Sequence, residues 1–314
     1  MEYAIGVDIG GTKIQFAAID REGRICHRDL VPTQAQLGPQ QVIDKVFGGI
    51  SRIVSALGPD AEIAGIGIGS AGQIDFQTGT VAYAVETLPG WTGTPIKRLI
   101  EERFGKPTFV DNDVNVIAVA EKVYGAGREH ASFVCLALGT GIGGAIVEAG
   151  RLLRGAFGGA GELGHVSVDF NGPRCGCGNS GCIELYASGT GIAKLGREAL
   201  RESGERPGWQ PDSREIVRAW LAGDRLAGQV MDRVIRALGT AIAGFIHTFN
   251  PEAVIIGGGV SETGPVFFEA LEKEVRARTS TAMRDACRLL HACVGADSGV
   301  IGAAAQIWYY RNKT

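Results

Sequence analysis

The sequence predicts an α/β protein made of two similar halves. Segments typical of strands alternate with segments of helical spacing along the 314 residues, which is the pattern of α/β folds. Residues 3–20 place two β-rich runs around a glycine turn at 10–13, and residues 133–150 place two more around a glycine turn at 139–141. This recurrence predicts that each half opens with a β-hairpin, and the chain length favours two domains.

The first half continues with elements that each carry a local signal. Residues 62–75 have the pattern of a buried strand followed by a loop, and Pro95 suits the first position of a helix that runs to Phe104. A short strand then leads into the trio 111–113, and a helix follows that ends near Gly125.

The second half is dominated by one long helix. Apolar residues recur at helical spacing over 226–249, and the dipeptide Asn250-Pro251 ends this helix. Residues 253–259 are predicted to form a buried strand that runs into a glycine turn, with a further helix behind it. The chain closes with another helix over 298–310.

These elements predict where the two domains begin and end. We expect the first domain to span residues 1–114 and to be joined by the terminal helix at about 300–314. The second domain is then expected to span 115–299 and to include the cysteine-rich loop.

Composition and charge exclude several classes of function. The net charge is −3 with no long run of either sign, so we expect no nucleic-acid partner and no membrane surface. The first residues lack the basic region of a signal peptide, and the seven cysteines are an odd number, so we expect a cytoplasmic protein without a disulfide framework. Four cysteines stand alone in apolar surroundings and are expected to be buried thiols: Cys26, Cys135, Cys287 and Cys293.

The glycine turns are candidate phosphate sites. Glycines let a phosphate approach the backbone, Thr12 and Lys13 add a hydroxyl and a charge, and Asp8 can reach Mg²⁺ through water. A glycine hairpin beside a buried aspartate explains the first motif equally well, because short glycine motifs recur by chance. The turn at 139–141 favours phosphate binding, since two such hairpins can hold the two ends of a triphosphate. A third turn, at 257–259, suits an adenosine group, although a strand-to-helix turn alone explains it.

Three cysteines fall in the stretch CGCGNSGC at 175–182. With His165 upstream, they make a His/Cys₃ set of the kind that closes a tetrahedral Zn²⁺ site. The Cys-x-Cys spacing alone also allows a disulfide or a redox pair, whereas the cytoplasmic setting and the fourth ligand favour a metal. Glu162 and Glu184 flank the set, so a loop folded around an ion brings both carboxylates near one spot. The plainer alternative is that they are surface charges, as most glutamates are.

The trio Asp111-Asn112-Asp113 supplies a candidate general base. A hydroxyl that attacks a γ-phosphate needs a carboxylate to orient it and to accept its proton. The alternative is an Asx helix cap, which is frequent at such a junction and which the residues alone favour. Both interpretations can hold for different members of the trio.

Together these motifs resemble the ROK family of sugar kinases, within the actin/hexokinase-like ATPase superfamily. The matching pieces run in the family's order from residue 8 to residue 259: DIGGTK, DNDVN, LGTGIGG, GELGH, CGCGNSGCIELYASG and IIGGGVS. The resemblance implies two actin-like (ribonuclease H-like) domains flanking a cleft for nucleotide and sugar. It also implies ATP with Mg²⁺, a structural Zn²⁺, a hexose substrate and a homodimer.

The resemblance implies a role for each candidate residue. Asp113 is implied as the general base. The implied sugar contacts are Ala71, Gly72, Asn112, Asp113, Glu162, His165 and Glu184. The implied nucleotide contacts are Asp8, Gly10, Gly11, Thr12, Lys13, Thr140, Gly141, Gly257 and Gly258. The implied zinc ligands are His165, Cys175, Cys177 and Cys182, so that one imidazole nitrogen faces the metal and the other the sugar.

The implied reaction transfers the γ-phosphate of ATP to a sugar hydroxyl, with glucose as the first choice and glucose 6-phosphate as its product. N-acetylmannosamine and fructose are alternatives, because Thr87 stands where many glucose-phosphorylating members have asparagine. A sugar-sensing repressor is a second class, but the first hairpin begins too near Met1 to leave room for a helix-turn-helix module. A sugar-binding protein without catalysis is a third class, against which Asp113 argues.

Overall fold

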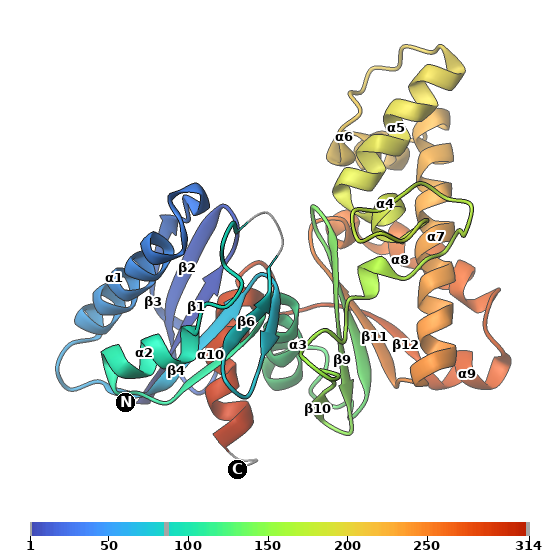
Figure 1. Cartoon of the computed structure of the whole chain (residues 1–314). Helices are drawn as coiled ribbons and strands as arrows, with labels where there is room; N and C mark the ends of the chain where they lie inside the picture. Colours follow the sequence, from blue (N-terminus) through green and yellow to red (C-terminus); the bar gives the residue numbers. More distant parts are fainter. Residues whose placement is uncertain (1, 85–87, 312–314) are drawn as a thin grey trace. The chain divides into compact units, whose positions relative to one another are not determined.

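The chain folds into two compact units in the computed structural model, which describes residues 2–84 and 88–311 (Figure 1). Unit 1 comprises the chain up to Glu129, the segment Leu152–Ala160 and the chain from Cys293 onward. Unit 2 comprises His130–Arg151 and Gly161–Ala292.

The division between the units differs in detail from the expected one at 114/115. Helix α3 (Asp113–Tyr124) packs against helix α10 (Ser298–Arg311), so it belongs with unit 1. The return of Leu152–Ala160 to unit 1 has no counterpart in the sequence-based division, because nothing in the local pattern announces it.

Unit 1 contains a five-stranded sheet in the order β3-β2-β1-β4-β7. Its strands are β1 (Glu2–Ile9), β2 (Lys13–Ile19), β3 (Ile25–Pro32), β4 (Glu62–Ser70) and β7 (Thr108–Asn112). β1 and β2 form the expected antiparallel hairpin, whereas β1, β4 and β7 run parallel, so their carboxyl ends meet at one edge. The register pairs Asp8 with Gly69 and Gly69 with Asp111, which brings two candidate motifs to this edge. A small hairpin, β5 (Gln73–Asp75) with β6 (Thr80–Tyr83), follows β4.

Unit 2 repeats the same strand plan in the order β10-β9-β8-β11-β12. Its strands are β8 (Phe133–Leu138), β9 (Ile142–Glu148), β10 (Arg151–Leu152), β11 (Ala253–Gly257) and β12 (Arg288–His291). β8 and β9 form the second predicted hairpin, and β8, β11 and β12 run parallel. The recurrence of the glycine hairpins in the sequence therefore reflects a repeated sheet, and the predicted α/β class of two similar halves is confirmed.

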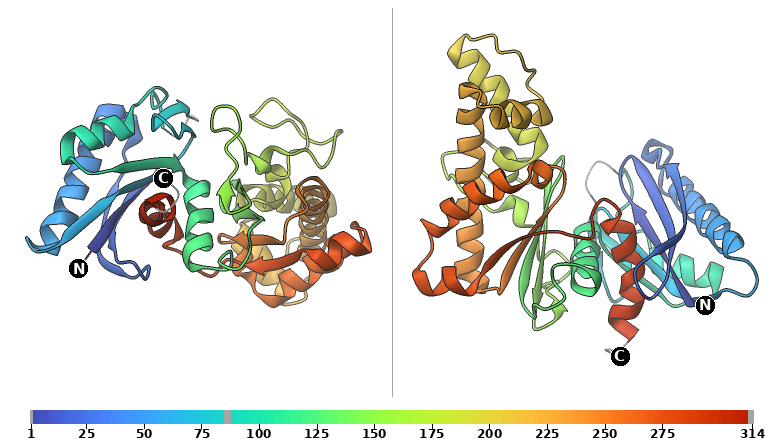
Figure 2. Two further views of the ribbon diagram at one scale, coloured as in Figure 1. Left: turned by 90° about the horizontal axis from the view of Figure 1, so that it is seen from below. Right: turned by 180° about the vertical axis from the view of Figure 1, so that it is seen from behind.

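Helices cover both faces of the sheet of unit 1 (Figure 2). α1 (Pro39–Leu57) and α2 (Ile96–Phe104) share one core with Ile5 and Val7, while α3 and α10 pack on the opposite face with Ala4. Glycines allow α10 to lie directly on the strands. A Cβ on Gly6 would come within 2.1 Å of the Val300 carbonyl oxygen, and one on Gly67 within 1.7 Å of the Ala303 carbonyl oxygen.

The helices of unit 2 pack around α7 (Arg225–Phe249), the long helix that the sequence predicts. Asn250 ends it in the left-handed conformation, with φ 45°. The other helices are α4 (Glu184–Ala187), α5 (Gly189–Ser203), α6 (Ser213–Leu221), α8 (Pro265–Arg276) and α9 (Thr281–Ala286). Short 3₁₀ turns lie at η1 (Ala35–Leu37), η2 (Leu163–His165) and η3 (Ser261–Thr263).

Two local predictions are corrected by the structure. Pro95 precedes α2 as its N-cap, and the helix begins at Ile96. Cys26 and Cys293 are exposed and Cys287 is half-buried, so only Cys135 of the four single cysteines is a buried thiol. Cys26 lies in β3, an edge strand that turns most of its side chains to solvent, and Cys293 lies in the loop before α10.

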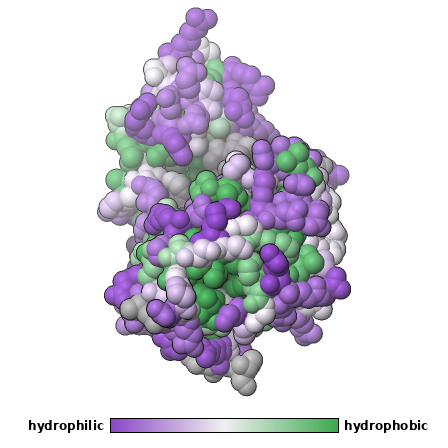
Figure 3. Space-filling model, turned by 90° about the vertical axis from the view of Figure 1, so that its left-hand side faces the viewer, coloured by the Kyte–Doolittle hydropathy of each residue, from purple (hydrophilic) through white to green (hydrophobic). Residues whose placement is uncertain are grey.

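The surface mixes polar and apolar side chains on the face drawn in Figure 3. Within residues 2–84 and 88–311, no helix combines the length and the apolar character needed to cross a membrane.

Candidate active site

The first glycine turn is held by backbone and Thr33 hydrogen bonds, and its tip is exposed to solvent. The Gly10 amide donates to the Lys13 carbonyl at 3.1 Å, and Thr33 reaches the turn twice. Its amide donates to the Thr12 carbonyl at 2.9 Å and its hydroxyl to the Gly10 carbonyl at 2.7 Å. Gly11, Thr12 and Lys13 are exposed. These hydrogen bonds hold the backbone of the turn, while its exposed tip is open to an anion.

Asp8 lies at the end of β1, beside this turn. Its carboxyl group is packed against α10, because a Cβ on Gly299 would lie 2.5 Å from Asp8 Oδ2. Burial raises the pKa of Asp8 from 3.8 to about 6, against the charge of Lys13, which lowers it. The carboxylate is thus mostly ionised near pH 7 and is held in a place where a cation would relieve its desolvation.

Asp8→Asn is expected to stabilise the nucleotide-free protein at pH 8 while leaving its stability at pH 4 nearly unchanged. A raised pKa in the folded state means that Asp8 stabilises the fold below pH 4 and that this stabilisation is lost as the pH rises through about 6. Burial of the ionised Asp8 carboxylate lowers the free energy of unfolding by about 1–3 kcal/mol at pH 8. The neutral side chain of asparagine does not have this effect. Urea unfolding of both proteins at pH 4 and pH 8 measures the difference. An equal difference at the two pH values would contradict the burial of this charge.

Asn112 caps helix α3. Its Oδ1 accepts the Val114 amide at 2.8 Å and the Asn115 amide at 3.2 Å, and its Nδ2 donates to the Gly72 carbonyl at 2.9 Å. Asp113 is the first helical residue and is half-buried, with Oδ1 3.0 Å from the Val114 amide nitrogen. The Asx cap and the candidate base are therefore different residues, as the sequence allowed.

The Ala71-Gly72 loop is positioned between β4 and this cap. The Ala71 amide donates to the Ile9 carbonyl at 3.2 Å, and the buried indole of Trp91 donates to Ser70 Oγ at 3.0 Å. Gly72 has φ +102°, and a Cβ there would lie 2.6 Å from the Tyr83 carbonyl oxygen, so only glycine fits. The position discussed for sugar choice, Thr87, lies outside the described residues.

Unit 2 brings the GELGH segment against the cysteine loop. The Ile183 amide donates to the Val166 carbonyl at 2.9 Å, and the Val168 amide donates to the Gly181 carbonyl at 2.9 Å. This pairing places His165, at the end of η2, close to Glu184, at the start of α4. Glu162 directly precedes η2 and is exposed.

Glu184 also contacts the second glycine hairpin. Its Oε2 accepts the Ile142 amide at 2.9 Å, and a Cβ on Gly141 would lie 2.5 Å from this same oxygen. A side chain at position 141 would displace the Glu184 carboxylate from the Ile142 amide, so Gly141 has a packing role whether or not it contacts a phosphate. The contact links a candidate sugar residue to a candidate phosphate turn within one unit.

His165, Cys175, Cys177 and Cys182 form a four-donor cluster whose ligand atoms all lie within 4.8 Å of one another. Cys175 Sγ lies 3.7 Å from His165 Nδ1, and Cys177 Sγ lies 3.6 Å from Cys182 Sγ. A tetrahedral zinc with ordinary bond lengths separates such atoms by about 3.6 Å for N···S and about 3.8 Å for S···S. The donor set thus fits Zn²⁺ in type, number and spacing. Nδ1 is the nitrogen that faces the sulfurs, which leaves Nε2 on the other side of the ring.

A pocket of about 900 Å³ opens beside the second glycine turn in unit 2. Thr140 forms one wall, and α5 holds it there, since Thr190 Oγ1 donates to the Thr140 carbonyl at 2.9 Å. The third turn contributes Gly259 to the lining. Gly257 and Gly258 do not line it; a Cβ on Gly258 would lie 2.5 Å from the Leu138 carbonyl oxygen, so this glycine is needed for packing.

The sequence did not reveal three arginines that line the same pocket. Arg197 comes from α5, and Arg214 and Arg218 come from α6. These arginines come together because α5 and α6 both lie beside the second glycine turn. The spacing of residues along the sequence does not predict this arrangement. Asp212 and Glu262 line the pocket as well, so the lining carries charges of both signs, and the three arginines are the groups in it that suit an anionic ligand.

The candidate residues thus divide between the units. Unit 1 holds Asp8, the turn at 10–13, the loop at 71–72 and the pair 112–113, whereas unit 2 holds the remaining candidates.

Comparison with known proteins agrees with these motifs. The ROK family model matches residues 4–308. The glucokinase of Thermotoga maritima is 37% identical over 310 residues, covering 96% of both chains. The ROK hexokinase structure from Thermus thermophilus has TM-score 0.84 and 34% identity, covering 99% of this chain and 100% of that one. A ROK glucokinase structure from Streptomyces griseus, in complex with glucose and AMPPNP, has TM-score 0.81 and 33% identity, covering 97% and 98%. This chain belongs to the ROK family.

Proposed function

We propose that this protein is an ATP-dependent hexose kinase that transfers the γ-phosphate to a sugar hydroxyl, with glucose as the preferred acceptor. The observation that carries the proposal is that Asn112 provides the N-cap of α3. Asp113 is therefore not needed as the cap, which leaves its carboxylate for the role of general base. The relatives named glucokinase, and the related structure in complex with glucose and AMPPNP, support glucose and ATP as substrates.

Asp113 acts as the general base in this proposal. Its carboxylate orients the acceptor hydroxyl and takes its proton as the hydroxyl oxygen bonds to the γ-phosphorus. The bond between that phosphorus and the bridging oxygen breaks, and ADP leaves with the electron pair. Asn112 is proposed to hold a sugar hydroxyl, and Ala71 and Gly72 to border the sugar, because the Asn112 amide is tied to this loop at 2.9 Å.

Glu162, His165 and Glu184 are proposed to hold the remaining sugar hydroxyls. His165 would do so through Nε2, since Nδ1 faces the cysteines. We propose that the four-donor cluster binds a structural Zn²⁺, because all four ligands come from the protein and none is left open. The ion would fix the orientation of the imidazole and of the loop that ends at Glu184.

Each glycine hairpin is proposed, within its own unit, as a contact for nucleotide phosphates. Gly11, Thr12 and Lys13 offer backbone amides, a hydroxyl and an ammonium group to phosphate oxygens. The Gly10 amide is bonded within the turn, so this glycine is proposed to allow a close approach of the phosphate. Thr140 and Gly141 offer a hydroxyl and backbone amides. The pocket beside Thr140, with Gly259 in its wall, has the size for an adenosine group. Mg²⁺ would neutralise charge on the phosphates, and Asp8 is the carboxylate proposed to bind its water ligands.

Two further expectations belong to the proposal. We expect a cytoplasmic protein, because the three clustered cysteines are suited to metal binding only when reduced. A homodimer is expected from the resemblance alone, and light scattering of the purified protein measures it directly.

ADP formation from ATP with a panel of sugars tests the proposed function. Glucose is expected to give the highest kcat/KM, above mannose, fructose, N-acetylglucosamine and N-acetylmannosamine. A clear preference for N-acetylmannosamine or fructose would replace glucose with that sugar and keep the kinase. The absence of sugar-dependent ADP formation across the panel would refute the kinase.

A further inference from the structure

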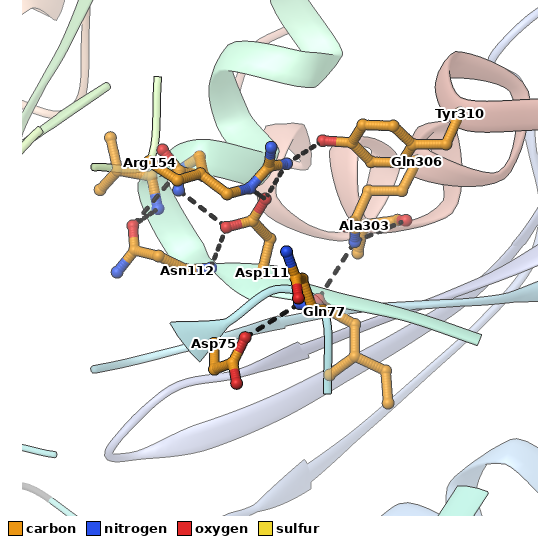
Figure 4. Close-up of polar contacts among 11 residues, drawn as sticks. Asp75, Gln77, Asp111, Asn112, Arg154, Ala303, Gln306 and Tyr310 are labelled. Atoms are coloured by element: carbon orange, nitrogen blue, oxygen red, sulfur yellow. Dashed lines mark hydrogen bonds and ion pairs between the residues drawn. The ribbon is translucent and has the colours of Figure 1, made fainter. Parts of the chain in front are cut away.

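Arg154 forms a buried ion pair with Asp111, the residue that precedes the proposed catalytic pair Asn112–Asp113 (Figure 4). It comes from the segment Leu152–Ala160 of unit 1, which begins at the second residue of β10. Its Nε and Nη2 donate to Asp111 Oδ2 at 3.1 and 2.7 Å. The Asp111 side chain is 1% exposed and that of Arg154 is 19% exposed, so the pair is largely shielded from water.

Asp111 connects Arg154 to the start of α3. Its other oxygen, Oδ1, accepts the Asn112 backbone amide at 2.9 Å and Asn115 Nδ2 at 2.7 Å. One carboxylate therefore binds the guanidinium on one side, and the peptide of Asn112 and the first turn of α3 on the other. Asp113, the first residue of α3, lies between Asn112 and Asn115, the two residues that Asp111 holds.

Two aromatic residues contact the guanidinium, and a third packs against both of them. Its central carbon lies 3.6 Å from the centroid of the Phe76 ring, and Nη2 also donates to the Tyr310 hydroxyl. Phe76 stacks on Phe109, with centroids 6.1 Å apart, and Tyr310 packs on both rings. α10, which carries Tyr310, is itself anchored on β4, where Gln306 Nε2 donates to the Ile68 carbonyl at 3.1 Å (Figure 4). These rings leave the arginine little freedom to turn away from Asp111.

We propose that Arg154 is a positioning residue for the general base: through Asp111 it fixes the Asp111–Asn112 peptide and the first turn of α3, and thereby holds Asp113 in the orientation that catalysis needs. The inference rests on the proposed function of Asp113. A planar guanidinium that binds one carboxylate oxygen through two nitrogens restricts its direction, which a single point charge does not. Since small displacements of a reacting group reduce rates strongly, the arrangement acts on the catalytic step.

Arg154→Met is expected to lower kcat about 10–100-fold and to change the KM values of glucose and ATP by less than about threefold. Arg154→Lys should lie between this variant and the wild type, because an ammonium group keeps the charge without the planar fork. If Arg154 has only a structural role, Arg154→Met should lower the melting temperature while the folded protein keeps the wild-type kcat. Disorder of the segment Leu152–Ala160 could also displace Glu162, the proposed sugar contact that follows it, and this would raise the KM of glucose.

The single variant leaves Asp111 buried without its partner and can fail to fold. The double variant Asp111→Asn/Arg154→Met removes both charges, and the asparagine oxygen can still accept the Asn112 amide. Positioning predicts that the double variant regains melting temperature while kcat stays low. If kcat recovers together with stability, the ion pair is only structural and the inference is overturned.

Asp20→Asn is the matched control. Asp20 is also buried, 4% exposed, and pairs with Arg24 Nε at 2.7 Å, but it lies just beyond the end of β2 opposite to the glycine turn. Its loss should lower the melting temperature and leave kcat at the wild-type value. The wild-type chain separates the two hypotheses: if it phosphorylates no sugar, the proposed function fails and the inference falls with it. If it is active and Arg154→Met matches its kcat, only the inference fails.

Discussion

Asp113→Asn is expected to lower kcat by about 10²–10⁴-fold, the range for loss of a general base, while glucose still binds. Asparagine keeps the shape and the hydrogen-bonding oxygen of the side chain but cannot accept the proton. The helix should not be disturbed, because Asn112 and not Asp113 provides the cap. Steady-state kinetics measure kcat, and calorimetry with glucose measures binding.

Asp44→Asn is the control for this substitution. Asp44 is exposed on α1, where it accepts a hydrogen bond from Gln40 at 3.0 Å, and none of the proposed roles involves it. Its variant should have wild-type kinetics. If Asp113→Asn turned over within a few-fold of this control, another group would be the base.

Cys177→Ser is expected to reduce bound zinc from about one per chain to a small fraction and to destabilise unit 2. Cys177 is exposed, so the exchange of sulfur for oxygen removes no core packing and any large effect must come through the metal. Zinc ligation contributes directly to folding free energy. A loss of about 2 kcal/mol would lower the melting temperature by about 4–8 °C. Elemental analysis and thermal unfolding are the measurements.

Cys26→Ser isolates the effect of the cluster. Cys26 is also exposed but lies in β3 of unit 1, outside the four-donor cluster, so its variant should keep both zinc and stability. A metal-free wild-type protein with full activity would refute the zinc site. So would a disulfide between Cys175 and Cys177 in protein kept reduced.

The elements that follow from local chemistry could be predicted from the sequence. The two hairpins depend on β-rich runs around a glycine turn, and the long helix depends on apolar spacing up to Asn250. The metal cluster could also be predicted from the sequence, because one histidine and three cysteines are the ligand types of a zinc site, and a shared ion requires them to lie together in the fold.

Other features depend on tertiary contacts that no local pattern encodes. Arg154 and Asp111 are 43 positions apart and meet only because the segment 152–160 returns to unit 1. Asn112 could not be separated from Asp113 as the cap, since both residue types suit that position. The glycines at 141 and 258 resemble phosphate-binding glycines, yet each also has a packing reason that only the neighbouring Glu184 and Leu138 reveal.

The most direct test of the proposed kinase is ³¹P NMR of a reaction that contains the wild-type protein, MgATP and glucose. The account predicts one sugar phosphate, glucose 6-phosphate, formed in equal amount to ADP, and almost none with Asp113→Asn over the same time. ADP that accumulates with inorganic phosphate and no sugar phosphate would contradict it, because the acceptor would then be water.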